Sequence, residues 1–234
     1  MDIRTYPNFV SRRYVDMREA FGKALLEGDH NAGRTPRDGD APWGASLIIR
    51  LSHPVAKRLA EVADTCCRAA RGPVLRYRAD ELHITVRSLE GYRAHSLTEA
   101  RREELSCYVT DSITGVSPFQ IQLRGLSGGG DSLFACGYAE PGLTQIRNAL
   151  HFRRHQIEST GPTSPDAARI RDTAHASLVL FRQRSEAEPN IATILDDYAE
   201  VDFGTQLVRE LTLVECTPNT SSVGMTSLAT IALQ

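Results

Sequence analysis

Two short motifs carry the side chains best suited to chemistry. His83, Thr85 and Arg87 alternate with apolar residues in the segment LHITVRSL. His175 and Ser177 alternate with apolar residues in AHASLVLF. Because side chains in a β-strand point alternately to its two faces, each segment predicts a strand that presents an imidazole and a hydroxyl on one face.

These side chains fit the opening of a phosphodiester. One group must take a proton from water and another must give one to the leaving oxygen. Imidazoles titrate near pH 6.5, so His83 and His175 can act as this pair, one neutral and one protonated. Thr85, Ser177 and Arg87 can bind the phosphate as negative charge develops. The acid and the base are not distinguished, because that depends on which ring faces the departing oxygen.

The repetition of the motif is the informative feature. Chance produces about one His-x-Ser/Thr in a chain with seven histidines and 35 Ser or Thr residues. Two occur, one in each half of the chain, and the two histidines are 92 positions apart. Joint action therefore requires a fold that brings the two strands side by side.

Composition limits the class of protein. The chain has 234 residues, of which 41% are hydrophobic and 24% charged, as in ordinary globular proteins. A net charge of −2 argues against binding of long duplex nucleic acid but allows a small anionic ligand. No apolar run is long enough for a signal peptide or a membrane span, so we expect a cytoplasmic protein with no membrane partner. The five cysteines lack CxxC spacing and are expected to be reduced core thiols.

Two regions are expected along the chain. Residues 1–43 read as an N-terminal helical extension and loop, with a helix over 9–27 and a segment rich in glycine and proline over 28–42. Residues 44–234 read as one two-lobed domain of mixed α and β structure. Its expected strands cover 45–51, 73–79, 82–89, 119–123, 133–138, 174–181, 207–216 and 223–233. Its expected helices follow Ser52, run from a capping box at Ser96 and Glu99 to about 115, and cover 142–158 and 191–198.

Other candidates for a site are weaker. His151 and His155 have the i, i+4 spacing of a helical metal site, but no carboxylate follows the first histidine as in HExxH, so a solvated helix face is favoured. SGGGD lacks the Lys-Ser/Thr of a phosphate-binding loop and predicts a hairpin turn. Trp43 and Tyr92 read as packing residues, with stacking on a base as the alternative.

Several arginines make the stretch before the second motif basic. A solvated face is the expected role for this group, and a rim that attracts a nucleotide phosphate is the alternative. Its members are Arg147, Arg153, Arg154, Arg169 and Arg171.

The paired motifs resemble those of the two-histidine (2H) phosphoesterase superfamily, in particular the bacterial 2′-5′ RNA ligase-like cyclic phosphodiesterases. LHITVRSLEGY is similar to the first motif of that group, and PFQIQLRGLSGGG to its mid-chain strand and glycine turn. The second motif has Ser177 where many relatives have Thr, which keeps the hydroxyl. The resemblance begins near Gly44 and implies a bilobal fold of two pseudo-symmetric antiparallel-sheet lobes with outer helices and a central cleft.

The resemblance also implies chemistry without a metal or other cofactor. The expected function is hydrolysis of a cyclic or internal phosphodiester of a nucleotide or an RNA end, and the most specific expectation is a 2′,3′-cyclic phosphodiesterase. His83 and His175 would be catalytic, and Thr85, Ser177 and Arg87 would bind the phosphate. The alternatives are a 2′-5′ RNA ligase, a phosphodiesterase of 2′-5′ linkages or signalling nucleotides, and a nucleotide sensor without turnover.

Overall fold

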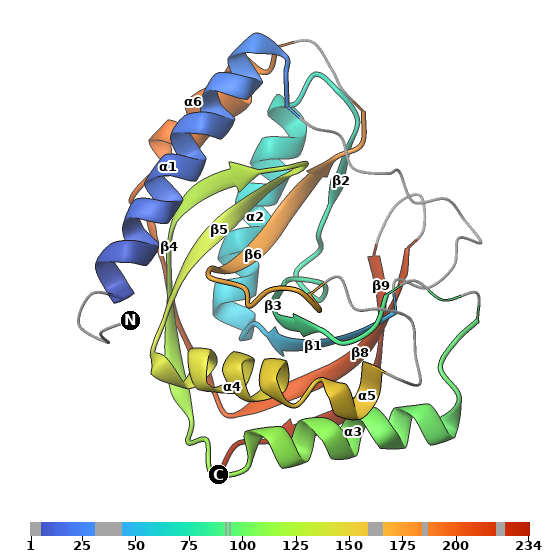
Figure 1. Ribbon diagram of the computed structural model, residues 1–234. Helices are drawn as coiled ribbons and strands as arrows, with labels where there is room; N and C mark the ends of the chain where they lie inside the picture. The colour runs from blue at the N-terminus through green and yellow to red at the C-terminus, as the bar shows by residue number, and fades with distance from the viewer. Residues whose placement is uncertain are drawn as a thin grey trace.

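The computed structural model describes residues 6–30, 44–91, 93, 95–158, 166–183, 187–218 and 223–234, in which helices and strands alternate (Figure 1). The helices are α1 (Tyr6–Glu27), α2 (His53–Ala69), α3 (Glu99–Ile113), α4 (Pro141–Phe152), α5 (His155–Glu158) and α6 (Pro189–Asp197). The strands are β1 (Ala45–Arg50), β2 (Val74–Arg76), β3 (His83–Ser88), β4 (Phe119–Gly129), β5 (Ser132–Ala139), β6 (Ala174–Phe181), β7 (Asp202–Val208), β8 (Glu210–Pro218) and β9 (Val223–Ala232).

The nine strands of the described residues form one sheet whose ladders are all antiparallel. The order is β7-β4-β5-β6-β3-β1-β8-β9, with β2 also paired to β6. β3 and β6 share one register pair, whereas every other ladder has at least three. The sheet thus consists of two lobes that meet at the narrow β3–β6 junction, and the predicted antiparallel α+β fold is confirmed.

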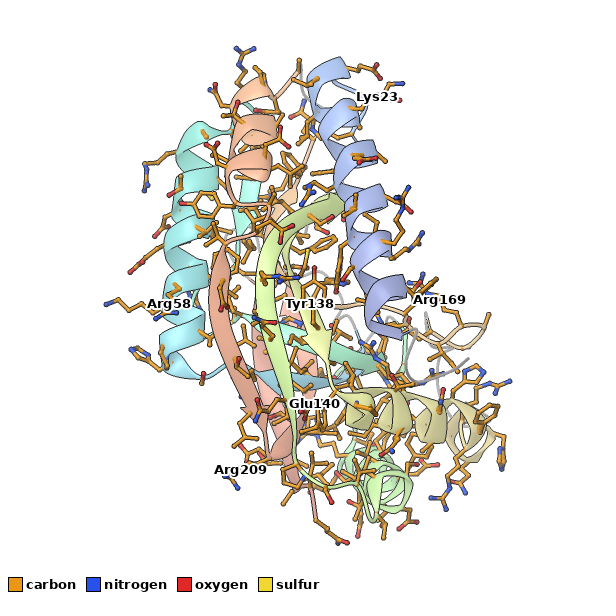
Figure 2. The ribbon with its side chains drawn as sticks, turned by 90° about the vertical axis from the view of Figure 1, so that its left-hand side faces the viewer. Lys23, Arg58, Tyr138, Glu140, Arg169 and Arg209 are labelled. Carbon is orange, nitrogen blue, oxygen red and sulfur yellow. The ribbon has the colours of Figure 1, made fainter. Side chains whose placement is uncertain are left out.

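The last strands differ from the sequence expectation. β7 ends at Val208 and β8 begins at Glu210, so that Arg209, labelled in Figure 2, alone separates them. β7 lies at one edge of the sheet and β8 next to the opposite edge. The predicted strand over 207–216 merged the end of β7 with β8, because no glycine or proline marks the place where the chain passes from one lobe to the other.

Helices cover both lobes. α2 packs on β6 and β7, while α4 packs on β3 and α3 on β9. The first turn of α3 is capped by Thr98, whose hydroxyl accepts the Arg101 N–H, and not by Ser96 as the capping-box pattern predicted. The predicted N-cap lies two residues before the observed one, and the helix itself lies where it was predicted.

We call the part of the sheet formed by β7, β4, β5 and β6 the first lobe. α1 lies against β4, β5 and α6, along the side of this lobe, at the left of Figure 1. A Cβ atom added at Gly128 would lie 1.9 Å from Phe21 Cδ1, so the close approach of this helix requires glycine there. The β4–β5 turn itself is formed by Gly130, with φ of 62°, and Asp131. SGGGD therefore supplies the predicted hairpin turn and also the packing surface for α1.

The main hydrophobic core fills the space between the sheet and the helices, and a smaller cluster lies between α1 and β5. All five cysteines are free, as predicted. Cys66, Cys136 and Cys216 are buried, whereas Cys107 is exposed on α3, so the expectation of a core position does not hold for Cys107. None of the described helices is long and apolar enough to cross a bilayer.

Candidate active site

The two predicted motifs lie on neighbouring strands, β3 and β6. Ile84 is the register partner of Ala176, and both side chains are fully buried. Because side chains alternate along a strand, the residues before and after this pair point to the opposite face. The two motifs therefore share one face of the sheet.

The antiparallel register places the polar residues of the motifs in cross-strand pairs. His83 lies opposite Ser177, and Thr85 lies opposite His175. All four side chains are partly accessible to solvent. Diagonal neighbours in an antiparallel ladder are about 7 to 8 Å apart, so His83 and His175 project from nearby points of the same face. The fold thus gathers two rings and two hydroxyls around one space.

The imidazole of His83 has a defined hydrogen bond. Its Nδ1 lies 2.7 Å from the backbone oxygen of Glu81. A carbonyl oxygen only accepts, so Nδ1 carries a proton and Nε2 is the nitrogen left to act on a substrate. Burial lowers the pKa of His83, the Glu81 carbonyl raises it, and the charges of Arg50 and Arg171 lower it, with a net decrease from 6.5.

The imidazole of His175 has a more apolar and more positive environment. Its Nδ1 lies 3.2 Å from the hydroxyl oxygen of Thr173, and its ring centroid is 4.5 Å from that of Phe134 on β5. Burial, together with the positive charges of Arg171 and Arg147, lowers the pKa of His175 to about 3. The free protein thus keeps this ring neutral.

Arg171 and Arg147 place positive charge at the junction. Arg171 affects the pKa of both histidines, and its Nε donates to Asp166 at 2.7 Å. Arg147 is a buried side chain of α4 that donates to the backbone oxygens of Thr85 and Val86. Its guanidinium therefore binds β3 just where this strand separates from β6. The predicted solvated face is wrong for Arg147 and holds for the exposed Arg169.

Arg87 has a different environment from the one predicted. Its side chain is buried, and its guanidinium donates to the backbone oxygens of Asp166 and Arg169. These bonds connect β3 to the segment that precedes β6. The strict alternation in LHITVRSL fails here because β1 and β3 change register between Leu47 and Ile48. We therefore assign Arg87 to the stability of this segment instead of to phosphate binding.

The remaining candidates do not join this group. α4 ends at Phe152 and α5 begins at His155, so His151 and His155 do not share one continuous helix as the sequence predicted. Within the described ranges, no group of three or more His, Cys, Asp or Glu side chains is arranged to hold a metal ion. Trp43 and Tyr92 lie outside the described residues.

Sequence reasoning missed two contacts at the histidines, the hydroxyl of Thr173 and the carbonyl of Glu81. Each belongs to the residue two positions before its histidine, and each lies at Nδ1 of the ring. The pattern Thr-x-His-x-Ser in the second motif contained the signal for Thr173, since period two places it on the same face as His175. No sequence signal identifies a backbone carbonyl as the partner of His83.

No protein-family model matches the chain, and no curated protein is significantly similar to it in sequence. Solved structures are similar in fold. E. coli LigT complexed with 3′-AMP has a TM-score of 0.60 and 20% sequence identity, with 82% of this chain and 99% of LigT covered. TT0787 of Thermus thermophilus has a TM-score of 0.59 and 19% identity, with 81% of this chain and 97% of TT0787 covered.

A third structure, described as a phosphoesterase, has a TM-score of 0.56 and 16% identity, and covers 82% of this chain and 99% of its own. The resemblance predicted from the two motifs is thus confirmed at the level of the fold. The chain has the fold of the LigT-like two-histidine phosphoesterases.

Proposed function

We propose that the protein is a two-histidine phosphodiesterase that hydrolyses a cyclic or internal phosphodiester of a nucleotide or an RNA end without a metal, and that its substrate is a 2′,3′-cyclic phosphate. The observation that carries the proposal is the Ile84–Ala176 register pair between β3 and β6, which supports the pairing of His83 with Ser177 and of Thr85 with His175 across the two strands. The fold of LigT, which has been observed with 3′-AMP and with phosphate, supports a nucleotide phosphate as the ligand.

The surroundings of the two rings support different roles. A proton added to His83 is stabilised because Nδ1–H donates to the Glu81 carbonyl, which favours the imidazolium form. A proton added to His175 meets the positive charges of Arg171 and Arg147. The first proton taken up by the pair therefore belongs mainly on His83. We assign His83 as the general acid and His175 as the general base.

The reaction follows from this assignment. Nδ1–H of His175 donates to Thr173, and Nε2 takes a proton from water as the water oxygen attacks phosphorus. The bond from phosphorus to the 3′ oxygen breaks, and Nε2–H of His83 gives its proton to that oxygen. The products are a 2′-phosphate monoester and a 3′-hydroxyl. Proton exchange with solvent then restores the neutral His175 and the protonated His83.

The cations and hydroxyls stabilise the negative charge. The hydroxyls of Thr85 and Ser177 donate to the phosphoryl oxygens, which gain charge in the transition state. Arg171 takes the place that the sequence assigned to Arg87, because its side chain remains partly accessible and its charge reaches both histidines. The anionic substrate in turn raises the pKa of both rings.

The direct test compares histidine variants on 2′,3′-cyclic AMP. His83→Ala and His175→Ala should each reduce kcat by about a hundredfold or more, because each removes one proton carrier. His155→Ala is the matched control, since this exposed histidine lies on α5 away from the junction. Circular dichroism and melting curves check that the variants fold. Near wild-type rates in either junction variant contradict the proposal.

The same assays separate the rival functions. Binding of the nucleotide with no turnover of cyclic, 2′-5′-linked or signalling phosphodiesters indicates a sensor. Formation of a 2′-5′ linkage from a cyclic phosphate and a free 5′-hydroxyl indicates a ligase. Hydrolysis of a 2′-5′ linkage in preference to the cyclic phosphate indicates a phosphodiesterase of linear substrates.

A further inference from the structure

Helix α1 contacts the strand that carries His175. The hydroxyl of Tyr14 lies 2.6 Å from the backbone oxygen of Ala174, the residue before His175, to which it donates. The same hydroxyl accepts the backbone N–H of Gly137 on β5 at 3.3 Å. Gly137 and Ala174 are register partners in the β5–β6 ladder. One side chain of α1 is thus hydrogen-bonded to both strands beside the candidate base.

A second contact runs through aromatic rings. The Tyr14 ring lies 6.3 Å from the ring of Phe134, which lies 4.5 Å from the imidazole of His175. Tyr14 and Phe134 are both buried, in a cluster separate from the main core. α1 therefore packs against Phe134 on β5, and Phe134 covers one side of the imidazole.

α1 is held in this position at several points. Phe21 packs on the backbone of Gly128, and Met17 lies 3.0 Å from where a Cβ of Gly129 would be. Arg13 pairs with Asp172 in the segment before β6 at 3.6 Å. The helix is a fixed part of the first lobe from Arg13 to Phe21.

We propose that Tyr14 is a positioning residue for His175 and that α1 contributes to the active site through this residue. This inference rests on the function proposed above. The motif resemblance described above begins near Gly44, so α1 precedes the segments that carry it. In this proposal α1 holds the second histidine of the chain in position.

The physical effect is on the orientation of one ring. Tyr14 fixes the peptide group that precedes His175, Phe134 limits the ring on one side, and Thr173 binds Nδ1. A general base acts efficiently only when its nitrogen is held in line with the attacking water, and small displacements reduce the rate strongly. Loss of the Tyr14 hydroxyl releases the peptide but leaves the substrate contacts in place.

The test is Tyr14→Phe, with Tyr108→Phe as the matched control. Tyr108 is also buried, and its hydroxyl also donates to a backbone oxygen, that of Leu150, but it lies on α3 away from His175. Each variant should lower the melting temperature by about 2 to 4 °C. Only Tyr14→Phe should lower kcat for 2′,3′-cyclic AMP, by about tenfold, with KM changed less than about twofold.

A readout independent of activity is the NMR spectrum of the histidine rings. Tyr14→Phe should shift the ring resonances of His175 and change its titration, while those of His155 stay unchanged and Tyr108→Phe affects neither. Equal effects of the two variants on kcat and on the His175 resonances overturn the inference. If the wild-type protein turns over no phosphodiester, the proposed function fails, and the His175 spectrum still decides whether Tyr14 positions this ring.

Discussion

Ile84 of β3 and Ala176 of β6 form, among the described residues, the one register pair between the strands of the two lobes. Both side chains are buried and unreactive, yet their pairing decides which polar groups meet on the other face. If β3 and β6 shifted by one residue relative to each other, the histidine and the hydroxyl of one motif would point into the core. The apolar residues of the two motifs therefore determine the geometry that the polar residues use.

The pH dependence of kcat/KM should report the two histidines of the free protein. The base must be neutral, so the rate falls as pH decreases through the pKa of His175, which burial and nearby arginines lower to about 3. The acid must be protonated, so the rate falls as pH increases through the pKa of His83, which is also lowered from 6.5. We expect a bell-shaped profile with its maximum below pH 6.5.

Substrate binding should move this profile. The anionic phosphate raises the pKa of both rings, so the maximum of kcat is expected at a higher pH than that of kcat/KM. The limbs belong to the coupled pair, and ring resonances measured by NMR with and without 3′-AMP assign them to His83 or His175. A kcat/KM that is constant from pH 5 to 9 contradicts the two-histidine account.

The hydroxyls facing the phosphate should act mainly in the transition state. Thr85→Val and Ser177→Ala remove donors aimed at charge that develops during the reaction, so kcat should fall by about tenfold to a hundredfold. The dissociation constant for 3′-AMP, measured by calorimetry, should change less than about threefold. A variant that loses affinity and turnover in the same proportion would instead favour a binding role for these hydroxyls.

Thr173 should control which nitrogen of His175 carries the proton. Thr173→Val removes the partner of Nδ1 and should lower kcat by about tenfold, whereas Thr173→Ser keeps a hydroxyl at this place and should restore most of the rate. Nitrogen NMR of the ring gives the tautomer in each variant. Equal rates in the Val and Ser variants would exclude this role.

Substitutions of Arg87 and Arg171 should have different effects, one on the stability of the fold and the other on the binding of phosphate. Arg87→Met removes hydrogen bonds to the backbone of Asp166 and Arg169 and should lower the free energy of unfolding by about 1 to 3 kcal/mol, with little change in phosphate affinity. Arg171→Gln should weaken binding of 3′-AMP by about tenfold. Urea unfolding and calorimetry measure both quantities. Loss of affinity in Arg87→Met with unchanged stability would restore the role that the sequence suggested.

The sequence predicted those features that depend on local periodicity. Alternation in LHITVRSL and AHASLVLF identified β3 and β6 and placed each histidine on the same face as its hydroxyl. Helical spacing identified α1, α2, α4 and α6, although the turn at Arg153 and Arg154 divides the predicted helix over 142–158 into α4 and α5. These features need no information about distant parts of the chain.

Features that depend on tertiary contacts could not be predicted from local periodicity. Arg87 departs from the strand period at the register change between β1 and β3, and its guanidinium binds carbonyls of the segment before β6, which no local pattern reveals. Arg147 appeared as one of several basic residues, and only the packing of α4 on β3 makes it buried. The contact of Tyr14 with Ala174 joins residues 160 positions apart.

The most direct measurement is phosphorus NMR of 2′,3′-cyclic AMP incubated with the wild-type protein in EDTA. We expect the cyclic phosphate signal to be replaced by a single 2′-phosphate monoester, because the ring of His83 protonates the 3′ oxygen and no metal takes part in the proposed reaction. Samples of His83→Ala and His175→Ala should retain the cyclic signal. Absence of turnover in EDTA with recovery on addition of zinc or manganese would contradict the account, as would a 3′-phosphate product.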